Sequence, residues 1–225
     1  MQEEVVRREN HFDGNDYQIL EYSDFLLVNG NKKLRIKKIG EKLASLNLFF
    51  LDFFKEYHIP AAVVKSHDKN SIKLAKHERY PFHIKILNVI DRRTSKIFTK
   101  KESELLNLPV FEIHYGDEKD SVVSEGYLIS FDLCTNEELK LIYRICSKVN
   151  AVLKSFFERR GYLLAEVSCY FGKSDDRIFL VDEFNSRSIK YISMNKEDRV
   201  IDPFKLSTSA EIRHYTDKLL NMTSI

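Results

Sequence analysis

Two adjacent acids, Asp182 and Glu183, follow an apolar run in the stretch RIFLVDEFNSRSIKY at residues 177–191. Residues 178–181 are all apolar, which is typical of a largely buried strand. Carboxylates at the end of such a strand can hold a magnesium ion over a cleft, because Mg²⁺ takes oxygen ligands. Charged residues are also the ordinary occupants of exposed turns. Taken alone, the stretch favours turn acids, and a magnesium site needs support from elsewhere in the chain.

The composition is that of an ordinary globular protein, with 43% hydrophobic and 31% charged residues in a chain of 225. A formal net charge of +2 is too small to indicate nucleic acid as the main partner. The apolar runs are too short for a membrane span, and the charged start MQEEVVRREN is unlike a signal peptide. Three scattered cysteines predict buried free thiols in a reducing cytoplasm. We therefore expect a cytoplasmic protein with neither a membrane nor a nucleic-acid partner.

The N-terminal part predicts short strands around one amphipathic helix. Residues 17–28 contain strand-like runs, and Asn29-Gly30 is typical of a tight hairpin turn. In residues 41–57, apolar side chains recur at helical spacing. The many aromatic residues of this helix are expected in the core rather than around a ligand. Apolar runs within residues 61–90 predict further strands.

The clearest helix spans residues 135–160. Thr135 and Glu138 form a capping-box pattern, in which each side chain accepts a backbone N–H of the first turn. Apolar residues then recur every three or four positions, and Gly161 is placed to end the helix. A last helix is predicted over residues 209–220.

Two strands follow the long helix. Residues 162–171 and 177–184 are joined by a short polar stretch and predict a hairpin. One face of the first strand is entirely apolar, whereas the other carries Glu166, Ser168 and Tyr170. Such a mixed face is expected where a sheet lines a cleft, but a face half exposed to water has the same pattern.

The order of these segments resembles the SAICAR synthetase family, the phosphoribosylaminoimidazole-succinocarboxamide synthases. The helix KVNAVLKSFFERRG, the strand LLAEVSCYFG and the strand IFLVDEFNSRSIKY follow one another as in that family. The upstream stretch LPVFEIHYGDEKDSVVSEGY is also similar, and GEKLASLNLFFLDFFKEYHIP less closely. The resemblance covers about residues 40–191 and rests on the ordered set of segments rather than on one diagnostic motif.

This resemblance implies an α+β fold in which a small N-terminal β-rich lobe and a larger C-terminal α+β lobe enclose a nucleotide cleft. The lobes would span residues 1–80 and 81–225. It also implies an ATP- and Mg²⁺-dependent ligase that activates a carboxylate as an acyl phosphate, which an amine then attacks. Magnesium would neutralise phosphate charge, and cations would hold the triphosphate and a ribotide phosphate. A homodimer is implied as one possible assembly.

The resemblance assigns roles to individual residues. Asp182 matches the family's acid near the magnesium–nucleotide complex, and Glu183 matches the acid beside it. Glu166 stands where the family has an aspartate, so Asp182 and Glu166 are the implied catalytic and metal-contacting acids. Lys76 falls near a lysine between the lobes and is implied, with Asp182 and Glu183, in nucleotide binding. The residues implied in substrate binding are Lys190, in place of an arginine for the ribotide phosphate, Arg187, Glu125 and Asp120.

Several positions depart from the family's pattern. Ser168 and Tyr170 stand where the family carries a lysine and a glutamate, and Leu87 stands where it has an arginine. Residues 90–93 replace a small Ala-Ala-Gly-Ser turn, and only RRENHFDGND stands for the family's N-terminal Gly-Lys-x-Lys strand. Losing one electrostatic group of this kind commonly costs about 10²–10³ in rate. We therefore do not expect SAICAR synthesis at a normal rate.

Two hypotheses stay open. The chain is either a divergent ATP-dependent amide ligase with a changed carboxylate, amine or both, or a non-catalytic relative that binds a ligand or a partner. A nucleic-acid binder ranks below both, because it rests on a basic cluster whose default is a solvated loop. That cluster consists of Arg92, Arg93, Lys96, Lys100 and Lys101.

Overall fold

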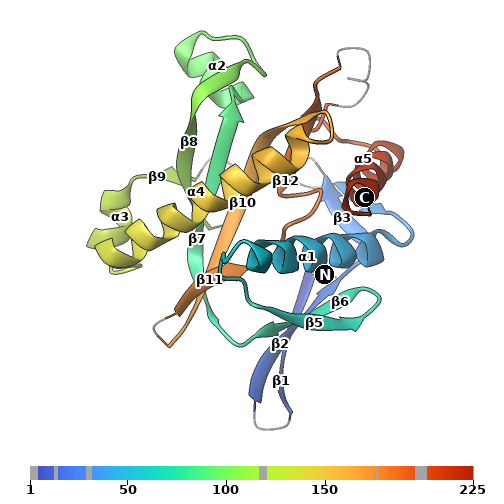
Figure 1. Cartoon of the computed structure of the whole chain (residues 1–225), viewed down its shortest axis with the longest axis vertical. Coiled ribbons are helices and arrows are strands. Elements are labelled where there is room, and N and C mark those ends of the chain that lie inside the picture. The colour runs from blue at the N-terminus through green and yellow to red at the C-terminus, as the bar shows by residue number, and fades with distance from the viewer. Residues whose placement is uncertain are drawn as a thin grey trace.

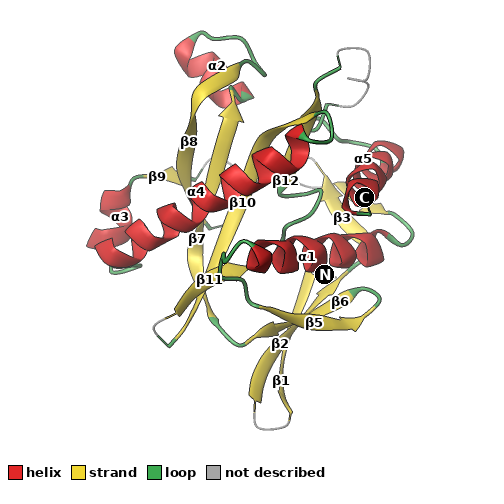
Figure 2. Cartoon of the chain, viewed as in Figure 1, coloured by secondary structure: helices red, strands yellow, loops and turns green. Residues whose placement is uncertain are grey.

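The computed structural model describes residues 5–12, 15–28, 32–116, 121–175, 177–195 and 202–224. A small sheet near the N-terminus lies beside a larger sheet flanked by helices (Figure 1, Figure 2). The small sheet is antiparallel throughout. Its strand order is β1 (Val5–Phe12), β2 (Asn15–Tyr22), β6 (Ser71–Ala75) and β5 (Val63–Asp68). The predicted α+β class is therefore confirmed.

A separate hairpin follows the small sheet's second strand. β3 (Phe25–Val28) pairs antiparallel with β4 (Lys32–Arg35). The predicted turn at Asn29-Gly30 lies outside the described residues, but the strands on either side of it pair as a hairpin requires.

The larger sheet positions the candidate site. Its strand order is β11 (Arg177–Val181), β10 (Tyr162–Ser174), β7 (Glu78–Val89), β8 (Leu105–Tyr115) and β9 (Val122–Val123), and β12 (Ile189–Ser193) also pairs with β10. β10 and β7 are antiparallel, with Ser168 opposite Lys85 and Tyr170 opposite His83. Directly opposed residues project from the same face of a sheet. Polar side chains from both strands therefore meet on one face.

Helices cover the other face and tie the two sheets together. α4 (Asn136–Glu158) packs on β10 and β7, and α1 (Ile39–Glu56) packs on the small sheet and against α5 (Ser209–Thr223) (Figure 1). α2 (Arg92–Phe98) lies in the β7–β8 connection, and α3 (Glu125–Ser130) precedes α4. The division into lobes at residue 80 stays a prediction. Among the described residues, no helix has both the length and the apolar character needed to cross a membrane.

Helix α4 forms as its sequence predicts. Thr135 Oγ1 accepts the Glu138 N–H at 3.1 Å, and Glu138 Oε2 accepts the Thr135 N–H at 2.8 Å, so both halves of the capping box are present. At the other end, Gly161 has φ 78, a conformation that glycine adopts without steric cost. The apolar face of α4 packs on the apolar face of β10, where Val167 and Phe171 are fully buried.

A cluster of phenylalanines joins α1 to α4. Phe50, Phe54 and Phe156 are at most 1% exposed, and the ring centroids of Phe50 and Phe156 lie 5.5 Å apart, edge to face. Fully burying such a side chain contributes about 1.5–3 kcal/mol. The aromatic residues of α1 therefore belong to the core, as predicted. The prediction of buried free thiols is also confirmed, for Cys134, Cys146 and Cys169.

Two local predictions are wrong. The strand predicted over residues 177–184 ends at Val181, because Asp182 adopts the left-handed conformation at φ 62 and leaves the ladder. The start of the basic cluster forms helix α2 rather than a loop. Asp91 caps this helix, since its carboxylate accepts the Thr94 N–H at 2.7 Å.

The loop after β11, which carries the two adjacent acids, is held by helices on both sides. The Phe184 N–H donates to Asn47 Oδ1 of α1 at 2.7 Å, and both residues are fully buried. The hydroxyls of Ser186 and Thr216, the latter on α5, lie 2.8 Å apart. Two helices that are distant in sequence therefore fix the backbone that presents the acids.

The Asn47→Ala variant should lower the free energy of unfolding by about 1–3 kcal/mol, because the buried Phe184 N–H loses its acceptor. Hydrogen exchange should accelerate across residues 183–188. Thr135→Ala is the control, since loss of a helix cap costs about 1 kcal/mol without touching this loop. Equal exchange of the loop in wild type and Asn47→Ala would contradict the anchoring role.

Candidate functional site

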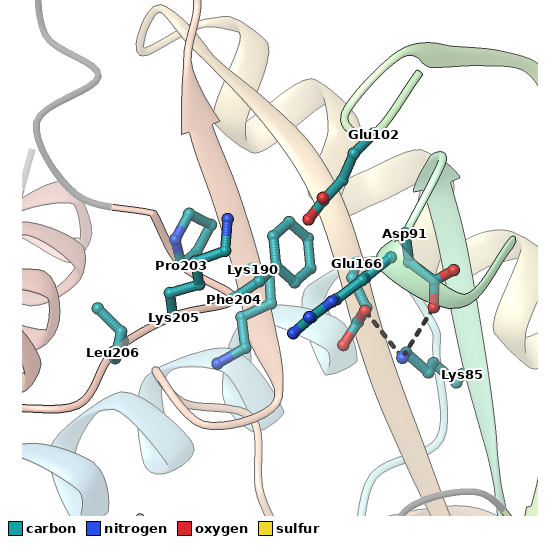
Figure 3. Close-up of a pocket in the computed structure, with 10 residues that line it drawn as sticks. Lys85, Asp91, Glu102, Glu166, Lys190, Pro203, Phe204, Lys205 and Leu206 are labelled. Carbon is teal, nitrogen blue, oxygen red and sulfur yellow. Dashed lines mark ion pairs between the residues drawn. The ribbon is translucent and has the colours of Figure 1, made fainter. Parts of the chain in front are cut away.

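The polar face of the larger sheet gathers charged side chains around Lys85. Its Nζ lies 3.0 Å from Glu166 Oε2 and 3.8 Å from Asp91 Oδ2 (Figure 3). Glu166 is 8% exposed and Asp91 is 9% exposed. Taking a carboxylate out of water costs several kcal/mol unless a cation compensates it. Lys85 supplies that compensation to two acids from different elements.

The acid Asp91 stays ionised in this setting. Burial raises its pKa, but hydrogen bonds from Thr94 and the charges of Lys85 and Arg93 outweigh burial and hold the pKa below its ordinary value. The same carboxylate caps α2. The start of this helix is thereby fixed to the polar face of the sheet.

Lys190 lies beside this cluster, on β12 and opposite Glu166. Its Nζ donates to the carbonyl oxygen of Ser186 at 3.3 Å. Desolvation lowers the pKa of Lys190 from 10.5 to about 8; Glu166 opposes this shift, whereas Arg187 and Lys85 add to it. A lysine perturbed in this way beside a cleft is a common sign of a functional site.

A cavity of about 300 Å³ opens over these side chains. Lys85, Glu166 and Lys190 line it from the sheet, and residues 203–206 line it from the C-terminal segment (Figure 3). Asp91, Arg92 and Glu102 complete the lining from the β7–β8 connection. The cavity brings together side chains that are far apart in the sequence, from Lys85 to Leu206.

Asp182 forms an ion pair with Arg79 of strand β7. This residue is 1% exposed, and its Oδ2 lies 2.7 Å from Arg79 Nε. The Arg79 guanidinium lies 4.9 Å from the ring centroid of Tyr170, which in turn stacks on His83 at 4.7 Å. The backbone of Asp182 is left-handed, with φ 62, a conformation that aspartate adopts more readily than most other non-glycine residues.

His83, which stacks on Tyr170, is a neutral spacer. Burial lowers the pKa of His83 to about 3, and His114, Arg79 and Lys85 act in the same direction. His83 therefore carries no charge at physiological pH. It stacks on His114 at 5.2 Å, and His114 Nε2 lies 3.1 Å from Glu112 Oε2. Along β7, the uncharged His83 ring separates the cations of Arg79 and Lys85.

The structure brings several of the predicted site residues together. Glu166 and Lys190 line the cavity. Asp182 and Glu183 lie on the adjoining loop, where Glu183 Oε1 accepts a hydrogen bond from Arg187 Nη1 at 3.2 Å. Arg187 thus has an acidic partner of its own within that loop.

The other predicted residues lie elsewhere. Lys76 lies in the connection between β6 and β7, where the two sheets join. Glu125 begins α3 and faces α4, since burial and a hydrogen bond to Glu125 raise the pKa of Tyr143. Figure 1 shows α3 and α2 at opposite ends of β8, so Glu125 is not brought to the cavity. Asp120 lies outside the described residues.

Sequence reasoning missed Arg79, His83 and Lys85, the β7 residues that organise this face. A signal was present, because His83 and Lys85 alternate with the buried Ile84 and Ile86. Period-two alternation places the polar pair on one face of a strand. Which residues of β10 they meet depends on the cross-strand register, which the alternation does not specify.

The family model of SAICAR synthetase matches residues 6–206. The chain belongs to the SAICAR synthetase family. The phosphoribosylaminoimidazole-succinocarboxamide synthase of Finegoldia magna is 26% identical over 174 residues, which cover 76% of this chain and 75% of that relative. The corresponding protein of Proteus mirabilis is 25% identical over 209 residues, or 91% and 88% of the two chains.

Solved structures of the SAICAR synthetase family share the fold. The phosphoribosylaminoimidazole-succinocarboxamide synthase of Ehrlichia chaffeensis superposes with a TM-score of 0.85 at 22% identity and covers 98% of this chain and 97% of its own. A SAICAR synthetase (Type-2) in complex with ADP has a TM-score of 0.85 at 21% identity and covers 98% and 96%. The predicted fold class is confirmed by both.

The two acids for which the family resemblance implies a magnesium contact each have a protein cation as partner. Arg79 engages Asp182, and Lys85 engages Glu166. Within the described ranges, no group of three or more His, Cys, Asp or Glu side chains could hold a metal ion. A magnesium ion bound together with a nucleotide takes most of its octahedral ligands from water and phosphate and needs only one or two carboxylates. The polar face thus carries fixed protein cations at the two acids for which a metal was expected.

Lys190→Met should raise the stability of the folded chain at pH 7. The folded-state pKa of about 8 lies below the ordinary 10.5, so the charged form is disfavoured in the folded state. That shift in pKa corresponds to a free-energy cost of about 3 kcal/mol for the charged form. Water still reaches the partly buried side chain, so the expected gain in stability of the variant is about 1–2 kcal/mol. The gain should be complete below pH 8 and fade as pH rises toward 10.5.

Urea unfolding of wild type and variant across this pH range provides the measurement. Lys148→Met, at an exposed position of α4, is the matched control and should change stability by no more than about 0.5 kcal/mol. If Lys190→Met has a lower free energy of unfolding than wild type at pH 7, burial does not disfavour the charged form of Lys190.

Proposed function

We propose that this chain is a divergent ATP-dependent ligase that joins a small carboxylate to an amine through an acyl phosphate. The carboxylate, the amine or both would differ from those of SAICAR synthetases. Membership of the SAICAR synthetase family supports the reaction class. The departures at Ser168, Tyr170 and Leu87 support the change of substrate.

The observation that carries this proposal is the cavity beside Glu166 and Lys190. Its sheet side offers two lysines, Lys85 and Lys190, to a carboxylate. An anion there would replace part of the hydration that burial removes from Lys190. A relative of the same fold was solved in complex with ADP, which supports nucleotide as the second ligand.

In the proposed reaction, a carboxylate oxygen of the substrate attacks the γ-phosphorus of ATP, and ADP leaves with the electron pair of the broken P–O bond. The amine nitrogen then attacks the acyl carbon, phosphate departs and the nitrogen loses a proton. Lys85 and Lys190 would orient the carboxylate, and Arg79, held by Asp182, would face phosphate charge. The cavity would also limit attack of water on the acyl phosphate.

The proposal includes a cytoplasmic location and small-molecule partners. The buried free thiols Cys134, Cys146 and Cys169 support a reducing compartment. The two-lobe division at residue 80 and a homodimer belong to the proposal through the family resemblance.

A non-catalytic relative that binds a ligand or partner is the second candidate function. Two ion pairs favour it, Arg79 with Asp182 and Lys85 with Glu166. Each pair compensates the charge of a buried carboxylate, so neither acid depends on a metal or nucleotide for its charge balance. Under this reading the cavity binds its ligand without turnover.

Thermal unfolding with and without Mg²⁺-ATP separates the two candidates. For the ligase, nucleotide at ~100 times Kd should stabilise wild type by about 2.7 kcal/mol, a Tm rise of about 5–10 °C. Asp182→Asn should abolish this rise, because Arg79 loses the partner that aims it. Substrate-dependent ADP release should disappear with it.

Asp182→Asn should also cost about 1–3 kcal/mol of stability, because it breaks a pair whose acid is buried and whose arginine is partly solvated. The change in Tm on addition of Mg²⁺-ATP is therefore measured for each protein relative to its own Tm without nucleotide. Asp217→Asn, which removes an exposed partner of Lys42, is the matched control. If wild type shows neither a Tm shift nor ADP release, only the non-catalytic candidate remains.

A further inference from the structure

The cavity over Lys190 has two chemically different walls. Charged side chains of the sheet and of the β7–β8 connection form one wall. The other wall is the C-terminal segment, which contributes the apolar side chains of Pro203, Phe204 and Leu206 (Figure 3). A ligand that satisfies both walls must therefore carry charge at one end and apolar surface at the other.

The charges that line the cavity are largely balanced. Lys85 is shared by Glu166 and Asp91, at 3.0 and 3.8 Å. Lys205, at the exposed rim, pairs with Asp202 at 2.9 Å. Arg92 and Lys190 are the remaining lining cations, and Glu102 lies on the same wall as Arg92. A ligand with a single negative charge suits this balance, whereas a phosphate dianion would bring a second charge close to three lining acids.

Lys190 is the cation best placed to meet such an anion. It lines the cavity from the sheet, and burial lowers its pKa to about 8. The charged or titratable groups around it are Glu166 on β10, Lys85 on β7, Arg187 on the loop and Tyr215 on α5. An ammonium group is a point donor rather than a planar fork, so it can hold one carboxylate oxygen but does not select for phosphate geometry.

The size of the cavity limits the ligand further. About 300 Å³ is at the lower end of the range for small-molecule sites. A single ring bearing a carboxylate fits this volume and can place the ring against Phe204. A nucleotide-sized molecule would exceed it.

We propose that this cavity binds a small, unphosphorylated monocarboxylate with an aromatic or apolar body, its carboxylate on Lys190 and its body against Phe204. This class differs from the ribotide phosphate that the family resemblance implies for Lys190. The inference rests on the proposed function, because it names the class of the carboxylate substrate. Binding alone is sufficient to test it, so a failed ligase assay leaves its own test intact.

Calorimetric titration of the full chain without nucleotide, at pH 7, provides that test. The probes are benzoate, the neutral isostere benzamide, phenyl phosphate and inorganic phosphate. We expect benzoate to bind at least about tenfold more tightly than benzamide or phenyl phosphate, and inorganic phosphate to show no saturable heat. Absence of benzoate binding, or tighter binding of phenyl phosphate, would overturn the inference.

Two variants locate the binding in the cavity. Lys190→Met should weaken benzoate about tenfold while bringing its affinity close to that of benzamide, and Phe204→Ala should weaken both probes alike. Lys148→Met and Phe131→Ala, at exposed positions outside the cavity, are the matched controls and should leave all affinities unchanged. Benzoate affinity that survives both cavity variants would place the carboxylate elsewhere and reject the assignment.

ADP release in the presence of benzoate and a panel of amines then separates the two claims. Benzoate binding without ADP release would reject the proposed ligase activity but support the proposed class of ligand. ADP release that requires a phosphorylated carboxylate keeps the ligase and removes the ligand class.

Discussion

Two buried acids, Glu166 on the polar face of the larger sheet and Asp182 on the loop beside it, are those that the family resemblance assigns to a metal, and each is paired with a cation from strand β7. Arg79 meets Asp182 at 2.7 Å, and Lys85 meets Glu166 at 3.0 Å. An unpaired carboxylate in this setting would cost several kcal/mol and would force its own protonation. The pairing therefore allows the fold to keep negative charge on a sheet whose opposite face is packed under α4.

Charge pairing of this kind also decides how the site responds to ligands. An anion that approaches Lys85 or Arg79 competes with a carboxylate already in place, so binding exchanges one partner for another. The net gain is then the difference between two interactions, which makes affinity sensitive to small changes in geometry. The uncharged stack of His83 and Tyr170 lies between the two pairs on the sheet.

The sequence predicted those parts of the fold that depend on neighbours along the chain. The capping box at Thr135 and the helical stride after it are local signals, and α4 forms where they indicate. The end of β11 was misplaced, because the loop that begins with the left-handed turn at Asp182 is also held by α1 and α5, which are far away in the sequence. The acids of the site were recognised from the family resemblance. Their cations were missed, because Lys85 meets Glu166 only through a register set by the whole sheet.

The backbone of Asp182 restricts which residues can follow it in evolution. Most L-amino acids pay about 1–2 kcal/mol in the left-handed conformation, whereas glycine, asparagine and aspartate adopt it at low cost. Codons for asparagine and glycine are each one base change away from those for aspartate. A single base change can therefore replace Asp182 by an uncharged residue that keeps the left-handed backbone. The negative charge at this position can be lost in evolution without a change in the path of the chain.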